Sequence, residues 1–294
     1  FSIERLDLMK KLPKWADILL IPLISLILAS LISALVIIII GENPLKAINL
    51  MIKGALGSTY GWGYTLYYAT NFIFTGLAVA VAFHARLFNI GGEGQAMLGG
   101  LGVALVALYI PWPHWSIALL ACSFGAALFG AVWGLIPGYL QASRGSHIVI
   151  TTIMFNFIGA ALLNYLLVNV LRPSGSMDPA TDKFPSSTHL PTLHEILQIL
   201  SIKFSKAAPA NICVFIAIFS AFFVWFLIWR TRLGYEIRAF GFSEKAAKYA
   251  GINHLKITVL TMIISGGLAG LMAINTTMGE SERLILNATE GAGF

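Results

Sequence analysis

Seven long apolar segments are the strongest constraint on how this chain folds. Each approaches the length of about 20 residues that an α-helix needs to cross the hydrocarbon core of a bilayer. Hydrophobic residues make up 57% of the 294 residues and charged residues 11%, whereas soluble domains are about half apolar and a quarter charged. The segments cover residues 18–40, 64–83, 94–110, 115–140, 148–171, 211–229 and 257–278, and we expect an eighth to begin near Gly291. The sequence therefore predicts an all-α integral membrane protein with about eight transmembrane helices.

The basic residues predict how these helices are oriented. With a cytoplasmic N-terminus, 12 of the 19 Lys and Arg residues fall in inner segments and 7 in outer ones, in keeping with the positive-inside rule. Because they stand in short segments between apolar blocks, without interleaved aromatic residues, the net charge of +6 does not indicate a nucleic-acid partner. We expect a multi-pass protein of the cell inner membrane, with the lipid bilayer as its surroundings.

Two long loops interrupt an otherwise single transmembrane domain spanning residues 1–294. The loop at 172–209 is expected outside, in the periplasm, and contains a short predicted helix at 193–200. The loop at 230–256 is expected in the cytoplasm. Within it, Ser243 suits a helix N-cap, Glu244 suits the first turn and Gly251 suits the residue after the last turn. This pattern predicts a helix of about two turns on the cytoplasmic surface.

The segment at 88–95, FNIGGEGQ, is the most unusual one, because three glycines, an asparagine, a glutamate and a glutamine stand where two apolar segments meet. Broken backbone at membrane depth is tolerated where it is buried in protein or lines a wet cavity, and an intramembrane carboxylate is a functional candidate. Asn89, Glu93 and Gln95 are therefore candidate residues of a solute passage. The other interpretation is a tight turn at the cytoplasmic interface, in which Glu93 caps the next helix and pairs with Arg86. The sequence leaves both open.

Polar residues and glycines inside the apolar segments form a second set of candidates. Asn71 and Asn156 could contact a solute, although hydrogen bonding between helices is the commoner use of such residues. The same holds for Asn164, Thr151, Thr152 and Ser265. Glycines repeat every four residues at 130, 134 and 138 and again at 266 and 270, which predicts close helix packing. Cys122 and Cys213 are expected to be inert packing residues, and the histidines lack the spacing of a metal site.

Catalytic motifs are missing from the sequence. It contains no G-x-x-x-x-G-K-[ST] phosphate loop, no G-x-S-x-G nucleophile and no dinucleotide fingerprint. We therefore expect a transport protein that is not an enzyme and binds no cofactor or metal, and that takes energy from a partner or an ion gradient.

Four segments together resemble a known family. They are ARLFNIGGEGQAMLGG at 85–100, TTIMFN at 151–156, GYEIRAFGFSEKAAKYAG at 234–251 and SGGLAGL at 265–271. In this order they resemble the membrane permeases of bacterial ABC importers, in the simple-sugar and nucleoside branch of the ribose and branched-chain amino acid permease family. The resemblance covers most of the chain and is more specific for the family than for the solute.

The resemblance implies the partners and the roles of particular residues. The cytoplasmic helix would be a coupling helix that fits a groove on an ATP-binding subunit, with contacts from Ser243, Glu244, Ala246, Ala247, Tyr249 and Gly251. ATP and Mg would be used by that partner. A second permease subunit would complete the passage, and a periplasmic or lipid-anchored solute-binding protein would dock on the outer loop. The expected solute is a nucleoside, with a pentose second. Asn89, Glu93 and Gln95 would shape the inner end of the passage, and Asn71 and Asn156 would face the solute.

The ends of the chain depart from the family pattern. The family continues beyond the position of Phe294 with further helices, and this chain opens on Phe1, so we expect it to be C-terminally incomplete. Two other functions stay open. An ion-coupled secondary transporter would act without an ATPase and would need ion-binding residues mid-membrane on several helices. A membrane-bound enzyme would need a cluster of His, Asp or Cys on facing helix ends.

Overall fold

The computed structural model describes residues 16–199 and 201–293, and the regular secondary structure of this part of the chain is helical apart from two isolated β-bridges. The prediction of an all-α protein is confirmed. The described residues fall into two compact units, one before Thr59 and one from Thr59 onward, and each is described by itself. The basic residues Arg5, Lys10, Lys11 and Lys14, on which the cytoplasmic N-terminus partly rests, lie outside the described residues.

The first unit consists of a short π-helix, η1 (Ala16–Leu20), and two α-helices, α2 (Ile21–Ile39) and α3 (Pro44–Leu56). Gly41 has φ +94° and lies in the turn after α2, a conformation that favours glycine. The Asn43 side chain caps α3 by accepting hydrogen bonds from the amides of Leu45 (2.9 Å) and Lys46 (3.4 Å). The sequence analysis missed α3, although Asn-Pro at its start is a helix signal.

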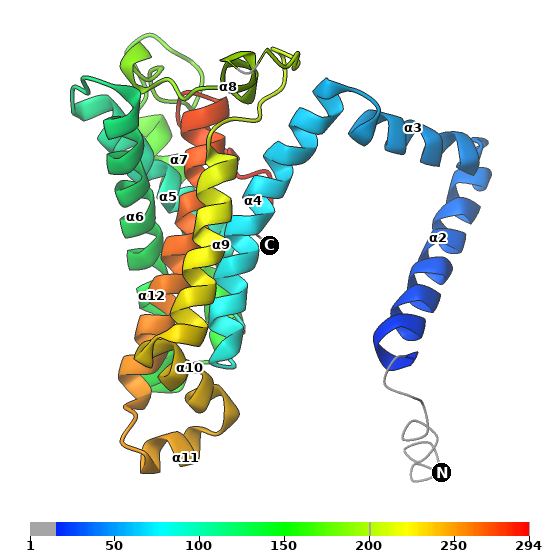
Figure 1. The fold of residues 1–294 in the computed structure, drawn as a ribbon. Coiled ribbons are helices and arrows are strands. Elements are labelled where there is room, and N and C mark those ends of the chain that lie inside the picture. Colours follow the sequence, from blue (N-terminus) through cyan, green and yellow to red (C-terminus); the bar gives the residue numbers. More distant parts are fainter. Residues whose placement is uncertain (1–15, 200, 294) are drawn as a thin grey trace. The chain divides into compact units, whose positions relative to one another are not determined.

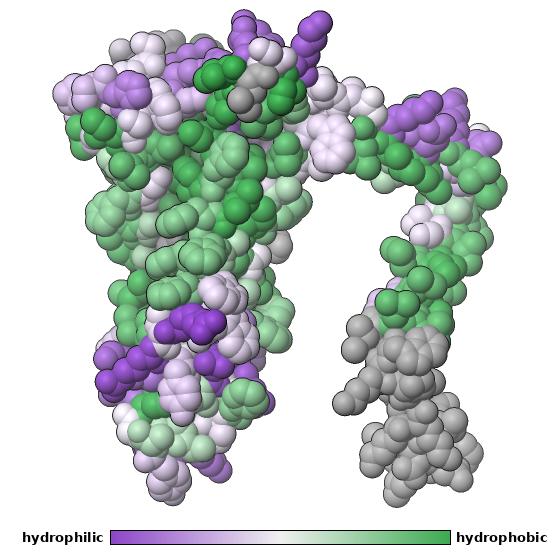
Figure 2. Space-filling model, in the orientation of Figure 1, coloured by the Kyte–Doolittle hydropathy of each residue, from purple (hydrophilic) through white to green (hydrophobic). Residues whose placement is uncertain are grey.

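The second unit is a helix bundle (Figure 1). Its helices are α4 (Thr59–His84), α5 (Gly92–Tyr109), α6 (Trp115–Arg144), α7 (Ile148–Asn169), η2 (Ser186–Thr188), α8 (Leu193–Ile199), α9 (Cys213–Arg230), α10 (Arg232–Phe242), α11 (Glu244–Tyr249), α12 (His254–Ala273) and η3 (Ile274–Glu280). Figure 2 shows hydrophobic surface along these helices and hydrophilic patches at their two ends. This is the pattern expected of a protein that crosses a bilayer.

Six helices of the described chain are long and apolar enough to span a membrane: α2, α4, α6, α7, α9 and α12 together with η3. Each of the seven predicted apolar segments contains a helix, but a count of eight spans is not confirmed. The predicted segment whose helix is not among these six candidate spans is 94–110, which forms α5. Helix α5 carries Glu93, Gln95 and several glycines, and it packs among α6, α7 and α12. Because α5 is mostly buried in protein, its sequence can be more polar than that of a lipid-exposed helix. Residues 286–293, where an eighth span was expected to begin, form turns up to the end of the described chain.

Glycines bring α6 and α12 into backbone contact. A methyl carbon built on Gly130 would lie 2.3 Å from the carbonyl oxygen of Gly266, and one built on Gly270 would lie 2.3 Å from that of Ala126. A methyl carbon on Gly134 would lie 2.6 Å from the carbonyl oxygen of Met262. Any larger side chain would push the helices apart. The prediction that these glycines serve close packing is confirmed.

The line of contact between the glycines of α6 and those of α12, called the glycine seam below, gives a test of stability. Replacing Gly266 with alanine places a methyl group 2.4 Å from the carbonyl oxygen of Gly130, so the helices must separate. Overpacking of this kind costs about 1–3 kcal/mol. We expect Gly266→Ala to lower the thermal unfolding midpoint of the protein in detergent. The control is Gly76→Ala in α4, where nothing lies within 4 Å of the new carbon. Equal midpoints for the two variants would contradict the packing role.

The short helix predicted after Ser243 is confirmed as α11. The Ser243 hydroxyl accepts from the amide of Ala246 (3.3 Å), and Gly251 has φ +81° two residues after the helix ends. The predicted helix at 193–200 is α8, which ends at Ile199, and residue 200 lies outside the described residues. The sequence analysis missed α10, which occupies the first half of the predicted inner loop. In Figure 1, α10 and α11 lie at one end of the bundle and α8 at the other.

Candidate functional site

The chain between α4 and α5 turns back into the bundle. It leaves α4 at His84 and turns at Arg86, which has φ +56°. Asn89 then donates from Nδ2 to the Ser265 hydroxyl of α12 (2.8 Å), and that hydroxyl donates to the carbonyl oxygen of Ala78 (2.7 Å). Ala78 lies about 9 Å before the end of α4 at 1.5 Å per residue. The polar segment therefore lies inside the bundle, and α5 begins there rather than at the bundle's end.

Side chains of α7 satisfy the broken backbone of this re-entrant segment. Asn156 accepts from the amide of Gly94 (2.9 Å) and donates to the carbonyl oxygen of Ile90 (2.8 Å). The Thr152 hydroxyl accepts from the amide of Ile90 (3.3 Å). Backbone groups without partners are costly in a membrane interior, so the two polar residues of α7 act as substitutes for the missing helical hydrogen bonds.

Asn89 and Gln95 form a reciprocal pair of amides across the start of α5. Asn89 Nδ2 donates to Gln95 Oε1 (2.9 Å), and Gln95 Nε2 donates to Asn89 Oδ1 (3.2 Å). Asn89 Oδ1 also accepts from the amide of Gly91 (2.9 Å). The exposed fractions of Asn89 and Gln95 are 3% and 1%. The two candidate residues lie together, and in this conformation protein groups bind both of them.

The Glu93 carboxylate contacts residues 289–293, at the end of the described chain. Its carboxylate accepts from the Thr289 hydroxyl and from the amides of Gly291 (3.2 Å) and Gly293 (2.9 Å). A methyl carbon on Gly293 would lie 2.3 Å from the amide nitrogen of Glu93, so only glycine fits. Three donors around one carboxylate compensate for its burial, because hydrogen bonds to a charged acceptor are the strong ones. Two segments of irregular backbone, 85–91 and 285–293, therefore meet inside the bundle.

This contact bears on the interpretation of Glu93 as an interfacial cap. The interfacial interpretation placed Glu93 as the cap of its own helix, paired with Arg86. In the described chain no ion pair joins Glu93 to Arg86, and the residue before α5, Gly91, makes no side-chain cap. Arg86 is exposed, whereas Glu93 is 3% exposed. In the described chain the cap and the Arg86 pairing of that interpretation are therefore wrong, because the chain carries Glu93 back into the bundle after the turn at Arg86.

Asn71 belongs to a second polar cluster, closer to the end of the bundle where α8 lies. Asn275 Nδ2 donates to Asn71 Oδ1 (2.8 Å) and to the carbonyl oxygen of Tyr67 (3.1 Å). Asn211 Nδ2 donates to Asn275 Oδ1 (3.0 Å), and the Tyr67 hydroxyl donates to Glu280. Asn275 is the second residue of η3, the π-helical continuation of α12. Such wide turns occur frequently at functional sites.

The structure groups four of the five predicted passage residues around the re-entrant segment and places Asn71 apart from them. Ser265 and Thr152 complete the first cluster, and the sequence analysis had named both only as general polar candidates. Asn275 was missed, although an asparagine inside the apolar segment 257–278 was a usable signal. Thr289 carried no signal, since its role depends on a residue almost 200 positions earlier in the chain.

The predicted coupling residues lie together on α11 and its caps. Tyr249 is 94% exposed, and Ser243, Glu244, Ala246 and Gly251 are exposed as well. Ala247 is 3% exposed and packs in the core beneath the helix. The exposed face of α11 therefore presents Tyr249, whereas Ala247 attaches the helix to the bundle.

The carboxylate of Glu93 can be tested by an isosteric change. In Glu93→Gln an amide nitrogen replaces one carboxylate oxygen. This nitrogen is a donor and faces a donor of residues 289–293, so that buried donor loses its acceptor. A buried donor or acceptor left unsatisfied costs about 1–3 kcal/mol. We expect a lower thermal unfolding midpoint and faster proteolytic cleavage after residue 285. Glu290→Gln is the matched control, because Glu290 is exposed and its carboxylate accepts a hydrogen bond from the exposed Tyr68 hydroxyl (3.0 Å). Identical cleavage rates would argue against the Glu93 contact.

Comparison with known proteins identifies the family. Residues 62–282 match the family described as branched-chain amino acid transport system, permease component. A guanosine ABC transporter permease protein of Bacillus subtilis, NupP, is 34% identical over 94% of this chain and 77% of its own length. A nucleoside ABC transporter permease protein of Lactococcus lactis, NupB, is 32% identical over 90% of this chain and 72% of its own. A glucose ABC transporter permease protein of Haloferax volcanii, TsgB13, is 30% identical over 93% and 71%. No solved structure matches. The chain belongs to the family of branched-chain amino acid transport system permease components.

Proposed function

We propose that this chain is the permease subunit of an ATP-driven importer that moves a nucleoside or a related simple sugar across the inner membrane by alternating access. The observation that carries this proposal is the re-entrant segment inside the bundle, with Glu93 bound by residues 289–293. Irregular backbone at membrane depth is the means by which transporters present polar groups to a solute. Relatives that are nucleoside, guanosine and glucose permeases support the choice of solute.

The chemistry of the two polar clusters suits a neutral polar solute. Asn71, Asn89, Gln95 and Asn156 offer amides, which both donate and accept hydrogen bonds, as nucleosides and sugars require. Two carboxylates lie in these clusters, Glu93 and Glu280, and protein donors bind both. Among the described residues that form the clusters, none is basic. An anionic solute would therefore find no counter-charge there.

In the proposed mechanism this conformation is closed to solute. The candidate side chains bind one another, so a solute would take over hydrogen bonds such as that between Asn89 and Gln95. ATP-driven movement of α10 and α11 would be transmitted to α12, against which α10 packs, and thus to Ser265. Family membership favours this ATP-driven function over an ion-coupled transporter acting alone.

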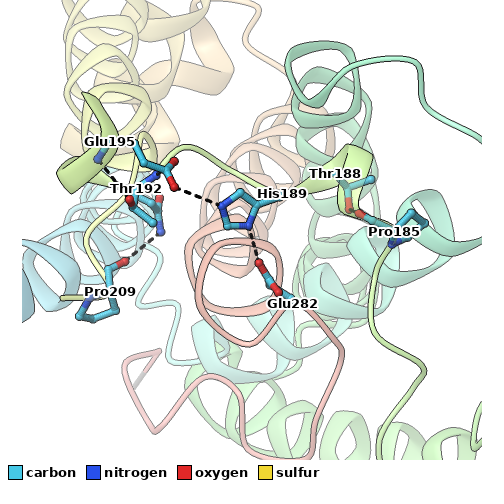
Figure 3. Close-up of polar contacts among 8 residues, drawn as sticks. Pro185, Thr188, His189, Thr192, Glu195, Pro209 and Glu282 are labelled. Atoms are coloured by element: carbon cyan, nitrogen blue, oxygen red, sulfur yellow. Dashed lines mark hydrogen bonds and ion pairs between the residues drawn. The ribbon is translucent and has the colours of Figure 1, made fainter. Parts of the chain in front are cut away.

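The proposed assembly comprises separate ATPase subunits, a second permease subunit and a solute-binding protein. The ATPase would bind α11 on the cytoplasmic side, and the solute-binding protein would dock on residues 172–209 in the periplasm. Figure 3 shows that His189 of this loop lies between two carboxylates, with Nδ1 2.5 Å from Glu282 and Nε2 3.8 Å from Glu195. These contacts tie the loop to the segment after η3, so a partner pressing on the loop would act on the segment that binds Glu93.

Uptake assays test the passage. We expect Asn156→Ala to lower ATP-dependent uptake of labelled guanosine by about tenfold in vesicles with the ATPase partner, since it removes two hydrogen bonds from the re-entrant segment. The control is Asn164→Ala on the same helix, where the asparagine is exposed. Unchanged uptake in Asn156→Ala would refute the assignment of the passage. Uptake that ignores ATP and stops when ion gradients are dissipated would refute the ATP-driven function.

Coupling is tested separately at Tyr249. Removing a large exposed aromatic residue from a docking surface is expected to weaken the interaction about tenfold or more. We expect Tyr249→Ala to reduce co-purification of the ATPase and transport together while the thermal unfolding midpoint stays unchanged. Lys183→Ala, an exposed change in the loop at the opposite end, serves as the control for ATPase co-purification. Full recovery of the ATPase with the Tyr249→Ala variant would contradict the assignment of α11 as the coupling helix.

A further inference from the structure

A hollow lies where α4 and α9 end beside α10. Its volume is about 440 Å³, within the range of about 300–1,000 Å³ that is usual for small-molecule sites. Phe83, Trp229 and Phe242 form aromatic walls, and Arg86 and Arg238 bring two cationic groups. These residues belong neither to the re-entrant segment's hydrogen-bond network nor to α11.

The hollow lies at the level where membrane spans end. Phe83 is the residue before the last of α4, and Trp229 is the residue before the last of α9, and both helices are candidate spans. Phe83 is 61% exposed and Trp229 is 53% exposed. Tryptophan is enriched at the boundary between hydrocarbon and head groups. Figure 2 shows the surface changing from hydrophobic along the helices to hydrophilic at this end of the bundle.

The two arginines in the hollow have no carboxylate partner among the described residues. Arg238 stacks on Trp229, with its guanidinium carbon 4.5 Å from the ring centroid, and its Nε donates to the carbonyl oxygen of Ile228 (3.1 Å). Both contacts fix the guanidinium in place without neutralising it. Among the described residues, neither Arg86 nor Arg238 forms an ion pair, and no carboxylate lines the hollow. Glu236, the acidic residue of α10, pairs with Arg232 instead (2.9 Å).

We propose that this hollow binds the phosphodiester head group of an anionic glycerophospholipid. The guanidinium groups of Arg86 and Arg238 bind the phosphate, a geometry for which arginine is suited. The glycerol and the first carbons of the acyl chains lie on Phe83 and Trp229, and the chains continue along the exposed apolar side chains of α9, among them Phe226 and Phe222. Basic pockets between transmembrane helices are a recognised form of lipid site.

A lipid fits the hollow better than an acidic segment of a protein partner. A soluble partner would have to cover Phe83 and Trp229, which are exposed and lie inside the candidate spans. The exposed tyrosine of α11, by contrast, offers a surface beyond the spans. The proposal is independent of the identity of the transported solute.

Native mass spectrometry of the purified full chain tests this proposal. The chain in detergent is mixed with an equimolar mixture of phosphatidylglycerol and phosphatidylcholine, and the ratio of the two bound lipids is measured. We expect selective retention of phosphatidylglycerol. Arg86→Gln and Arg238→Gln should each reduce the preference about fivefold, and the double variant should reduce it by the product. The double lysine variant, Arg86→Lys with Arg238→Lys, keeps both charges and should retain most of the preference.

Arg232→Gln is the matched control, because its side chain is 92% exposed and lies outside the hollow. Equal binding of both lipids by the unaltered chain would overturn the proposal, and so would the same loss of preference in the control. Two further results would also overturn it. The third is displacement of phosphatidylglycerol by inorganic phosphate alone, and the fourth is loss of ATPase binding in the arginine-to-glutamine variants while their lipid preference is unchanged. The third would indicate a site for free phosphate and the fourth a partner surface. The lipid ratio of the unaltered chain decides the question even if a variant fails to fold.

Discussion

The hydrogen bonds that Glu93 accepts from residues 289–293 are the contact on which the interior of the bundle depends. Irregular backbone is unstable in a membrane unless every polar group finds a partner inside the protein. The Glu93 carboxylate binds the backbone of residues 289–293. Asn156 and Thr152 bind the backbone of Ile90 and Gly94 in the re-entrant segment. The end of the described chain accordingly lies beside the middle of the helices (Figure 1).

Helix α12 links this site to the rest of the bundle. One face carries the glycine seam against α6, and the same helix positions Ser265 beside Asn89. Asn275, just beyond its α-helical part, lies about 15 Å further along the axis, where it joins Asn71. A shift of α12 along or about its axis would therefore change both polar clusters at once. The close contact with α6 restricts such movements to sliding or rotation along the seam.

Sequence patterns predicted the parts of this structure that depend on local chemistry. The apolar segments marked the helices, the glycine spacing marked the seam, and Ser243 with Gly251 marked α11. Contacts between distant segments could not be predicted. Nothing near Glu93 indicates that its donors come from Thr289 and Gly293, so the groups that the carboxylate contacts could not be predicted. The amphipathic α10 was missed because its apolar face packs against other elements and not lipid, so it lacks a long apolar run.

The π-helical turn at the end of α12 has a geometric consequence. In an α-helix each additional residue rotates everything after it by about 100°, so the direction of every side chain is tied to all the positions before it. A wide turn absorbs residues without advancing the helix by the usual amount. In η3 this changes the phase between the glycine seam and Glu280, which can then reach Tyr67 while the seam stays aligned with α6. The helix thus meets two angular requirements at once, the contact of its glycines with α6 and the contact of Glu280 with Tyr67.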